Sequence, residues 1–276
     1  MKRAGANARL AVFGALLCAV LLSSCAGTGS VAPASAPAAE MRDRITASDE
    51  PDAMRRGRTR MELAAAYFGR GQMTTALDQI KLSIQADPTS AAAFNLRGLI
   101  YANLGDQPLA EESFRRALQI DPHDADSMQN FGWYLCRQKR YADADPLFRQ
   151  ALAVANYRNA PRTLLAQGVC RANAGQLAGA EDSLSRSYEL DPGNPETAVD
   201  LSEVLYRRGD FERARFFVRR VNSLPDVSNA HTLWLAARIE NRLGNRQGVQ
   251  EFGTQLRNRF PDSREASLFQ QGAFDE

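Results

Sequence analysis

Small and bulky apolar residues recur along this chain at intervals of 34 residues, beginning near residue 57. Ala76 corresponds in this way to Ala110, and Gly98 corresponds to Gly132. Apolar residues spaced three and four positions apart between these points predict amphipathic helices. Because proline cannot continue a helix, Asp-Pro pairs mark the ends of several units, at 87–88, 121–122 and 191–192. The pattern therefore predicts an all-α chain made of antiparallel helix pairs.

The pattern continues for about six units and resembles the tetratricopeptide repeat (TPR). This resemblance implies a right-handed superhelical solenoid, in which each repeat packs on its neighbours. In each unit we expect the small residue at the eighth position, such as Gly98, to contact the Ala at the twentieth, such as Ala110. The predicted units are 57–90, 91–124, 125–160, 161–194, 195–228 and 229–262, followed by a short capping helix at 265–271.

The third unit departs from this pattern. It lacks the closing Asp-Pro pair and carries seven residues, 153–159, before Pro161. The insertion lengthens either the second helix of this unit or the exit from that helix. The last unit also differs, because Gly248 stands where the other units have Ala.

The first 25 residues have the pattern of a bacterial export signal. A basic start without acidic residues precedes an apolar stretch at 10–22, which is shorter than a bilayer-spanning helix requires. The segment that ends in Cys25 resembles a lipobox, and this resemblance implies cleavage after residue 24 and acylation of Cys25. An ordinary signal peptide with an incidental Cys is the alternative. Since residue 26 is Ala and not Asp, the sorting pattern favours the outer membrane.

The stretch after Cys25 is rich in Ala, Gly, Ser, Thr and Pro. Such a composition buries too little apolar surface to offset the entropy of ordering the chain. The sequence therefore predicts three parts: a signal peptide at 1–24, a lipidated flexible linker at 25–52 and a TPR domain at 53–276.

Charge and motifs exclude several function classes. The chain has 34 basic and 32 acidic residues, and removal of the signal peptide would leave 31 against 32, so nucleic acid is a poor candidate partner. His123 and His231 share no ligand spacing with the cysteines, and there is no nucleotide-binding loop or nucleophile motif. We therefore expect no catalysis, no cofactor, no metal and no small-molecule substrate.

Two cysteines remain in the predicted domain after Cys18 and Cys25 are accounted for. Cys136 and Cys170 fall in the first helices of the third and fourth units, which are expected to lie side by side. An exported chain reaches an oxidising compartment, which favours a disulfide. Neighbouring helix axes lie about 8–10 Å apart, however, and a disulfide needs closer Cα atoms. Two buried thiols are therefore the alternative.

A TPR array binds partners on its concave face, which the second, fifth, ninth and twelfth positions of each first helix line. Large apolar residues occupy several of these positions, and such a groove suits an apolar or amphipathic protein segment. Some of these side chains could instead be covered by neighbours and serve the core. The predicted groove residues are Phe68, Asn95, Leu99, Gln129, Trp133, Leu165, Val169 and Tyr206.

A dense group of arginines lies between Arg207 and Arg220, with only two acidic residues among them. The simplest interpretation is a solvated helix face. Contact with an acidic partner surface or with lipid headgroups is the alternative.

Three segments are more specific than the general TPR pattern: QNFGWYLC at 129–136, the insertion before Pro161, and LWLAARIE at 233–240. With the lipobox and six repeats, they resemble the PilW/PilF family of type IV pilus biogenesis lipoproteins. The resemblance implies a pilotin-like outer-membrane lipoprotein that faces the periplasm and helps the secretin subunit to localise or multimerise. In some members the cysteines that match Cys136 and Cys170 form a disulfide. The alternative is a periplasmic TPR adaptor of another envelope assembly, such as β-barrel assembly or cell-wall synthesis.

Overall fold

The structure, a computed structural model, describes residues 51–274. The predicted signal peptide, Cys25 and almost all of the predicted linker lie outside the described residues. In the described part of the chain, no helix combines the length and the apolar character that crossing a membrane requires.

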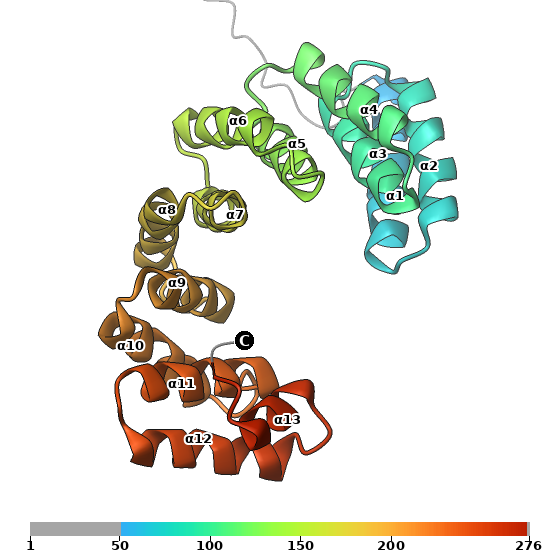
Figure 1. Ribbon diagram of the computed structural model, residues 1–276. Helices are drawn as coiled ribbons and strands as arrows, with labels where there is room; N and C mark the ends of the chain where they lie inside the picture. Colours follow the sequence, from blue (N-terminus) through green and yellow to red (C-terminus); the bar gives the residue numbers. More distant parts are fainter. Residues whose placement is uncertain (1–50, 275–276) are drawn as a thin grey trace, which may run out of the picture. The chain divides into compact units, whose positions relative to one another are not determined.

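Residues 51–274 form thirteen α-helices and no strand, so the all-α TPR fold is confirmed. Most helices are 12–14 residues long, and α1 is the longest at 18 residues. Twelve of them make six consecutive pairs, and α13 follows the last pair (Figure 1). The helices are α1 (Asp52–Gly69), α2 (Met73–Ala86), α3 (Ala91–Leu104), α4 (Gln107–Ile120), α5 (Ala125–Arg137), α6 (Tyr141–Ala153), α7 (Ala160–Asn173), α8 (Leu177–Leu190), α9 (Pro195–Arg208), α10 (Phe211–Asn222), α11 (Ala230–Arg242), α12 (Arg246–Arg259) and α13 (Arg264–Gln271).

The contacts between helices define an inner and an outer layer. Each odd-numbered helix packs against the next odd-numbered helix, from α1·α3 through α11·α13. Within the described residues, the backbones of even-numbered helices do not approach one another in this way, although some of their side chains meet, as Arg213 of α10 and Glu181 of α8 do. The odd-numbered helices are therefore the more closely spaced layer, which places them on the concave side of the array.

Local sequence fixes where these helices start and stop. Ser90 Oγ accepts a hydrogen bond from the backbone N–H of Ala93 and so caps α3, and Asp106 caps α4 in the same way. Gly105 ends α3 in the left-handed conformation, with φ of 82°. At the corresponding turn of the third repeat, Lys139 has a φ of 61°, where most other repeats use Gly.

The small residue at the eighth position makes room chiefly for a bulky side chain, in addition to the expected Ala in the fourth repeat. A Cβ atom added to Gly98 would lie 2.8 Å from Phe114 Cδ1, and one added to Gly168 would lie 2.5 Å from Leu184 Cγ. Both neighbours are the bulky residue at the twenty-fourth position, and the backbone oxygen of Ala180, the Ala at the twentieth, lies 3.3 Å from the Cβ added to Gly168. The glycine therefore makes room for a fully buried core side chain, whose insertion joins the two helices of the repeat.

The insertion in the third repeat lengthens the exit and not the helix. Helix α6 ends at Ala153, as short as its counterparts, and the added residues form a turn. Tyr157 Oη donates a hydrogen bond to Asp126 Oδ1 over 3.0 Å and accepts one from Thr163 Oγ1. The turn is thus tied to the start of α5 and to α7, and burial raises the pKa of Tyr157 to about 12.

The last repeat carries a buried charge at its centre. Glu240 on α11 is fully buried, and Arg219 on α10 donates to its Oε1 through Nε at 2.8 Å and Nη2 at 2.6 Å. A Cβ at Gly248 would lie 2.7 Å from Glu240 Cδ. The unusual Gly therefore leaves space for this carboxylate. Helix α13 then packs on α11 and α12.

Candidate partner-binding groove

A series of hollows follows the inner helix layer, and neighbouring hollows share lining residues. Trp133 and Arg162 line both the hollow over α1, α3 and α5 and the one over α5, α7 and α9. Glu196 joins the second of these to a third hollow over α9 and α11, and His231 joins the third to a fourth. The hollows therefore form one continuous groove.

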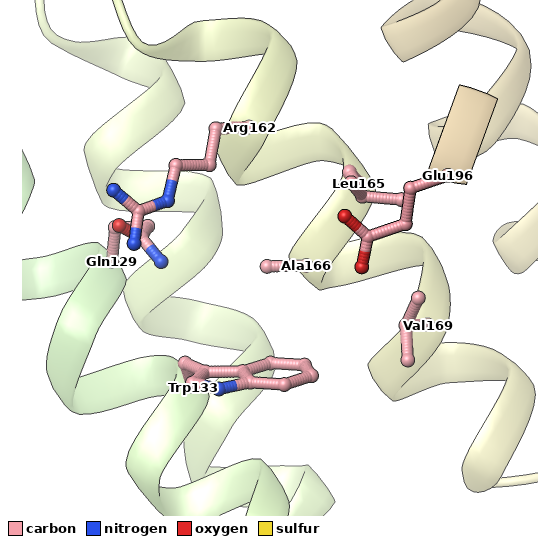
Figure 2. Close-up of a pocket in the computed structure, with 7 residues that line it drawn as sticks. All are labelled: Gln129, Trp133, Arg162, Leu165, Ala166, Val169 and Glu196. Carbon is pink, nitrogen blue, oxygen red and sulfur yellow. The ribbon is translucent and has the colours of Figure 1, made fainter. Parts of the chain in front are cut away.

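The central pocket of this groove has a volume of about 240 Å³ (Figure 2). Its buried floor consists of Gln129, Leu165 and Ala166, while the partly exposed Trp133 and Val169 form its walls. The ring of Trp133 turns its face toward the space. Two charged residues complete the lining, Arg162 from the first turn of α7 and Glu196 from the first turn of α9.

The hollow on the N-terminal side has a volume of about 250 Å³ and mixes apolar and amide side chains. Phe68, Leu99 and Trp133 supply its apolar surface, each from a different inner helix. Asn95 does not line this hollow. Its Oδ1 accepts a hydrogen bond from Nδ2 of Asn130, and Asn130 does line the hollow. The apolar strip across three repeats can hold a side-chain row of a bound protein segment.

The C-terminal hollows are richer in charge. His231 Nε2 lies 2.6 Å from Glu203 Oε1, and this hydrogen bond raises the pKa of the His231 imidazole. Burial raises the pKa of Asp200 to about 7, and the nearby carboxylates of Glu203 and Glu196 act in the same direction. Asp200 therefore titrates near neutral pH, so the charge of this end of the groove varies with pH.

An aromatic contact closes the far end of the groove. Arg238 lies over the ring of Tyr206, 4.7 Å from its centroid, and donates to the backbone oxygen of Phe274. Phe274 in turn stacks on Trp234 with centroids 5.3 Å apart. The residues after α13 therefore cover part of α11.

Seven of the eight groove residues expected from sequence line these hollows, and Asn95 lies beside them. Sequence reasoning missed Arg162 and Glu196. Both occupy the second position of their repeats, which is one of the four positions used to select groove residues. The register marks both positions, but the predicted set, which included the amides of Asn95 and Gln129, took no charged side chain.

Cys136 and Cys170 are joined by a disulfide in the structure, with Cα atoms 5.7 Å apart. The two residues lie on α5 and α7, next to the central pocket. Cα atoms lie about 2.3 Å from the helix axis, so facing residues on neighbouring helices can come within disulfide range at ordinary axis spacing.

Most of the arginine cluster is engaged in ion pairs. Arg208 and Arg213 both bind Glu181 of the preceding repeat, and Arg219 binds the buried Glu240. Arg215 pairs with Glu212 in the same helix. These contacts explain much of the cluster as links between repeats and leave fewer free cations than the sequence suggests.

No group of three or more His, Cys, Asp and Glu side chains in residues 51–274 is arranged to hold a metal ion. His231 is engaged with Glu203, as described above. His123 is exposed in the turn before α5.

Family models described as tetratricopeptide repeat match residues 89–156, 130–195 and 172–234. The type IV pilus assembly protein PilF of Pseudomonas aeruginosa is 26% identical over 210 residues, which are 76% of this chain and 83% of PilF. The cellulose synthase operon protein C of Xanthomonas axonopodis is 29% identical, but the match covers only 11% of that protein. This second similarity is therefore limited to the repeat segment of that much longer protein.

Two solved structures extend the comparison. PilW, described as a widely conserved type IV pilus biogenesis factor, matches with a TM-score of 0.71 and 32% identity over 76% of this chain and 96% of PilW. The structure of P. aeruginosa PilF has the same TM-score at 24% identity and supports the fold. Because the match to PilW spans almost that entire protein at this identity, the chain belongs to the PilW/PilF family of type IV pilus TPR proteins.

Proposed function

We propose that this protein is a non-catalytic scaffold that assists localisation and multimerisation of the secretin, and thereby type IV pilus biogenesis and stability. The observation that carries the proposal is the continuous groove along the inner helices, with Trp133 at the junction of two hollows. Its largely apolar floor, which includes the Gln129 amide, and its charged rim suit a segment of another protein. The family relationship supplies the pilus context.

The proposed mechanism is stoichiometric. The groove holds a segment of an unassembled secretin subunit, and the acyl chains on Cys25 bring the complex to the periplasmic face of the outer membrane. The linker at 25–52 lets the TPR domain sample the zone near the membrane. Binding and release account for the whole cycle, so no bond in the partner is broken.

Deletion of the gene tests this function. An outer-membrane blot should show loss of the heat- and detergent-resistant secretin multimer, and the wild-type lipoprotein should restore it. An unchanged multimer with missing or unstable pili would move the protein to a later pilus step. An unchanged multimer with normal pili would exclude both roles and favour another envelope assembly.

The anchor is tested separately by Cys25→Ser. This variant should fold but fractionate away from the outer membrane, since one acyl-modified Cys supplies the membrane attachment. Continued fractionation with the outer membrane would show that something other than the acyl group localises the protein.

A further inference from the structure

The floor of the central pocket contains a polar side chain without a partner. Gln129 is only 3% exposed, yet its carboxamide makes no hydrogen bond or other polar contact within residues 51–274. Nearby buried amides behave differently, since Gln167 donates to Asp145 and accepts from Ser183. The amide atoms still reach the pocket surface, since Tyr188 Oη is the only fully buried side-chain polar atom of residues 51–274 that lacks a hydrogen bond. Gln129 lines the pocket, so its hydrogen bonds are available to whatever fills that space.

The two charges on the pocket lining are also unpaired. Figure 2 shows the Arg162 guanidinium beside Gln129 and the Glu196 carboxylate on the other side of the pocket, near Val169. Neither side chain forms an ion pair with another described residue, whereas the arginines of α10 are largely paired. The pocket therefore presents a positive side on α7 and a negative side on α9.

The size of the pocket limits the occupant. Sites that enclose small molecules have volumes of roughly 300–1,000 Å³, and this pocket, at about 240 Å³, opens into hollows on both sides. Its dimensions fit one large side chain of a chain that continues along the groove. The face of Trp133 and the side chain of Val169 supply apolar contacts for that side chain.

We infer that the central pocket binds an extended protein segment in one fixed direction. One apolar side chain enters beside Trp133, and a peptide group next to it exchanges hydrogen bonds with the Gln129 carboxamide, which can donate and accept. An acidic residue on one side of the anchor faces Arg162, and a basic residue on the other side faces Glu196. The order of these two charges selects the direction of the segment. This inference rests on the proposed use of the groove for protein binding and adds the recognition chemistry.

The probe is a phage-displayed library of random twelve-residue peptides, panned on the purified full chain. Peptides selected by the wild type should share an apolar residue between one acidic and one basic residue, in a single order. The double variant Arg162→Glu, Glu196→Arg should select the opposite order and bind the wild-type peptides at least tenfold more weakly. Selection of the same order by both proteins, of peptides without flanking charges, or of no peptide at all would overturn the inference.

Two further variants separate the contributions. Gln129→Leu keeps a similar volume but removes the amide, so it should weaken selected peptides about tenfold whatever their charges. The matched control exchanges two exposed charges on the outer helix α8, Arg186→Glu with Glu189→Arg, and should bind like the wild type. Equal binding by Gln129→Leu and the wild type would remove Gln129 from the site.

Binding of the purified secretin subunit to the wild type is measured beside the peptides. A selected motif together with a secretin that does not bind would refute the proposed function and leave the inference about the pocket supported. A secretin that binds wild type and the charge-exchanged variant equally would support the function and overturn the inferred direction.

Discussion

The junction between the third and fourth repeats and the junction between the fifth and sixth are built from the same helix pairs but held by different chemistry. At the first, a disulfide links α5 to α7. At the second, Arg219 reaches from α10 to the buried Glu240 of α11. The inner surfaces differ too. The groove at the first junction combines the apolar Trp133 and Val169 with the unpaired charges of Arg162 and Glu196, whereas the second carries Asp200 and His231, whose pKa values are raised. The repeat pattern thus determines how the helix pairs pack, while a few residues outside the pattern determine how each junction is held and which charges its groove carries.

The largest effect is expected at the ion-paired junction. Arg219→Ala leaves the carboxylate of Glu240 buried without its main partner, and this should lower the free energy of unfolding by about 3–5 kcal/mol. Urea unfolding followed by circular dichroism measures the change. Arg220→Ala, on the same helix but exposed and outside any ion pair, is the matched control and should cost less than about 1 kcal/mol. Equal, small losses in both variants would show that the buried pair does not hold this junction.

The covalent junction should be nearly as sensitive. Replacement of both Cys136 and Cys170 by Ala removes the constraint on the unfolded chain, and a loop of this size predicts a loss of about 3–4 kcal/mol. The urea midpoint should fall by the amount that a reductant produces in the wild type, and the reductant should leave the variant unchanged. Two free thiols in the unfolded wild-type protein, detected by alkylation, would refute the bond itself.

The groove beside this junction should respond in binding more than in folding. Trp133→Ala removes a large, partly exposed aromatic side chain from two hollows, and we expect it to weaken capture of the secretin subunit by about 2–3 kcal/mol, or about 30- to 150-fold. Phe216→Ala removes an aromatic side chain that is 60% exposed on α10, outside the groove, and serves as the control. Biolayer interferometry should show an effect only for the groove variant, and equal affinities would remove Trp133 from the site.

The charged junction should also differ from the covalent one in its response to pH. The pKa of Asp200 is raised to about 7, so the folded chain keeps a proton that the unfolded chain releases near pH 4. Stability therefore falls as pH rises through 7, and the raised pKa of His231 acts in the same direction. Asp200→Asn should be more stable than the wild type by about 1–2 kcal/mol at pH 8, with the gap closing toward pH 4. A difference in free energy of unfolding that stays constant with pH would show that the raised pKa of Asp200 does not cause it.

The smallest expected effect concerns a turn within the third repeat. Lys139 holds a left-handed conformation that Gly adopts at less cost, so Lys139→Gly should raise the free energy of unfolding by about 0.5–1 kcal/mol. Gly105→Lys, at the equivalent turn of the second repeat, should lower it by a similar amount. Thermal unfolding of both variants measures the pair, and a loss of stability in Lys139→Gly would show that contacts of the Lys side chain outweigh the backbone strain.

Much of the fold could be predicted because its information is local. Helix pairs, their closing turns and the final short helix follow from a repeated spacing, and the inner position of Trp133 follows from the same register. Pairings between distant side chains could not be predicted in this way. The hydrogen bond of Tyr157 to Asp126 and the burial of Glu240 depend on which repeats become neighbours and on how closely they approach. Arg162 occupies one of the four groove positions of its repeat, so the register could have predicted its place on the rim, but the predicted groove set took no charged side chain.

The most direct test of the account compares two variants in a strain that lacks the gene. Trp133→Ala and Phe216→Ala, each expressed at the wild-type level, are examined for the detergent-resistant secretin multimer in the outer membrane. If the groove captures the secretin subunit, the groove variant fails to restore the multimer while the outer-helix variant restores it fully. Full restoration by Trp133→Ala would contradict the claim that this groove captures the secretin subunit.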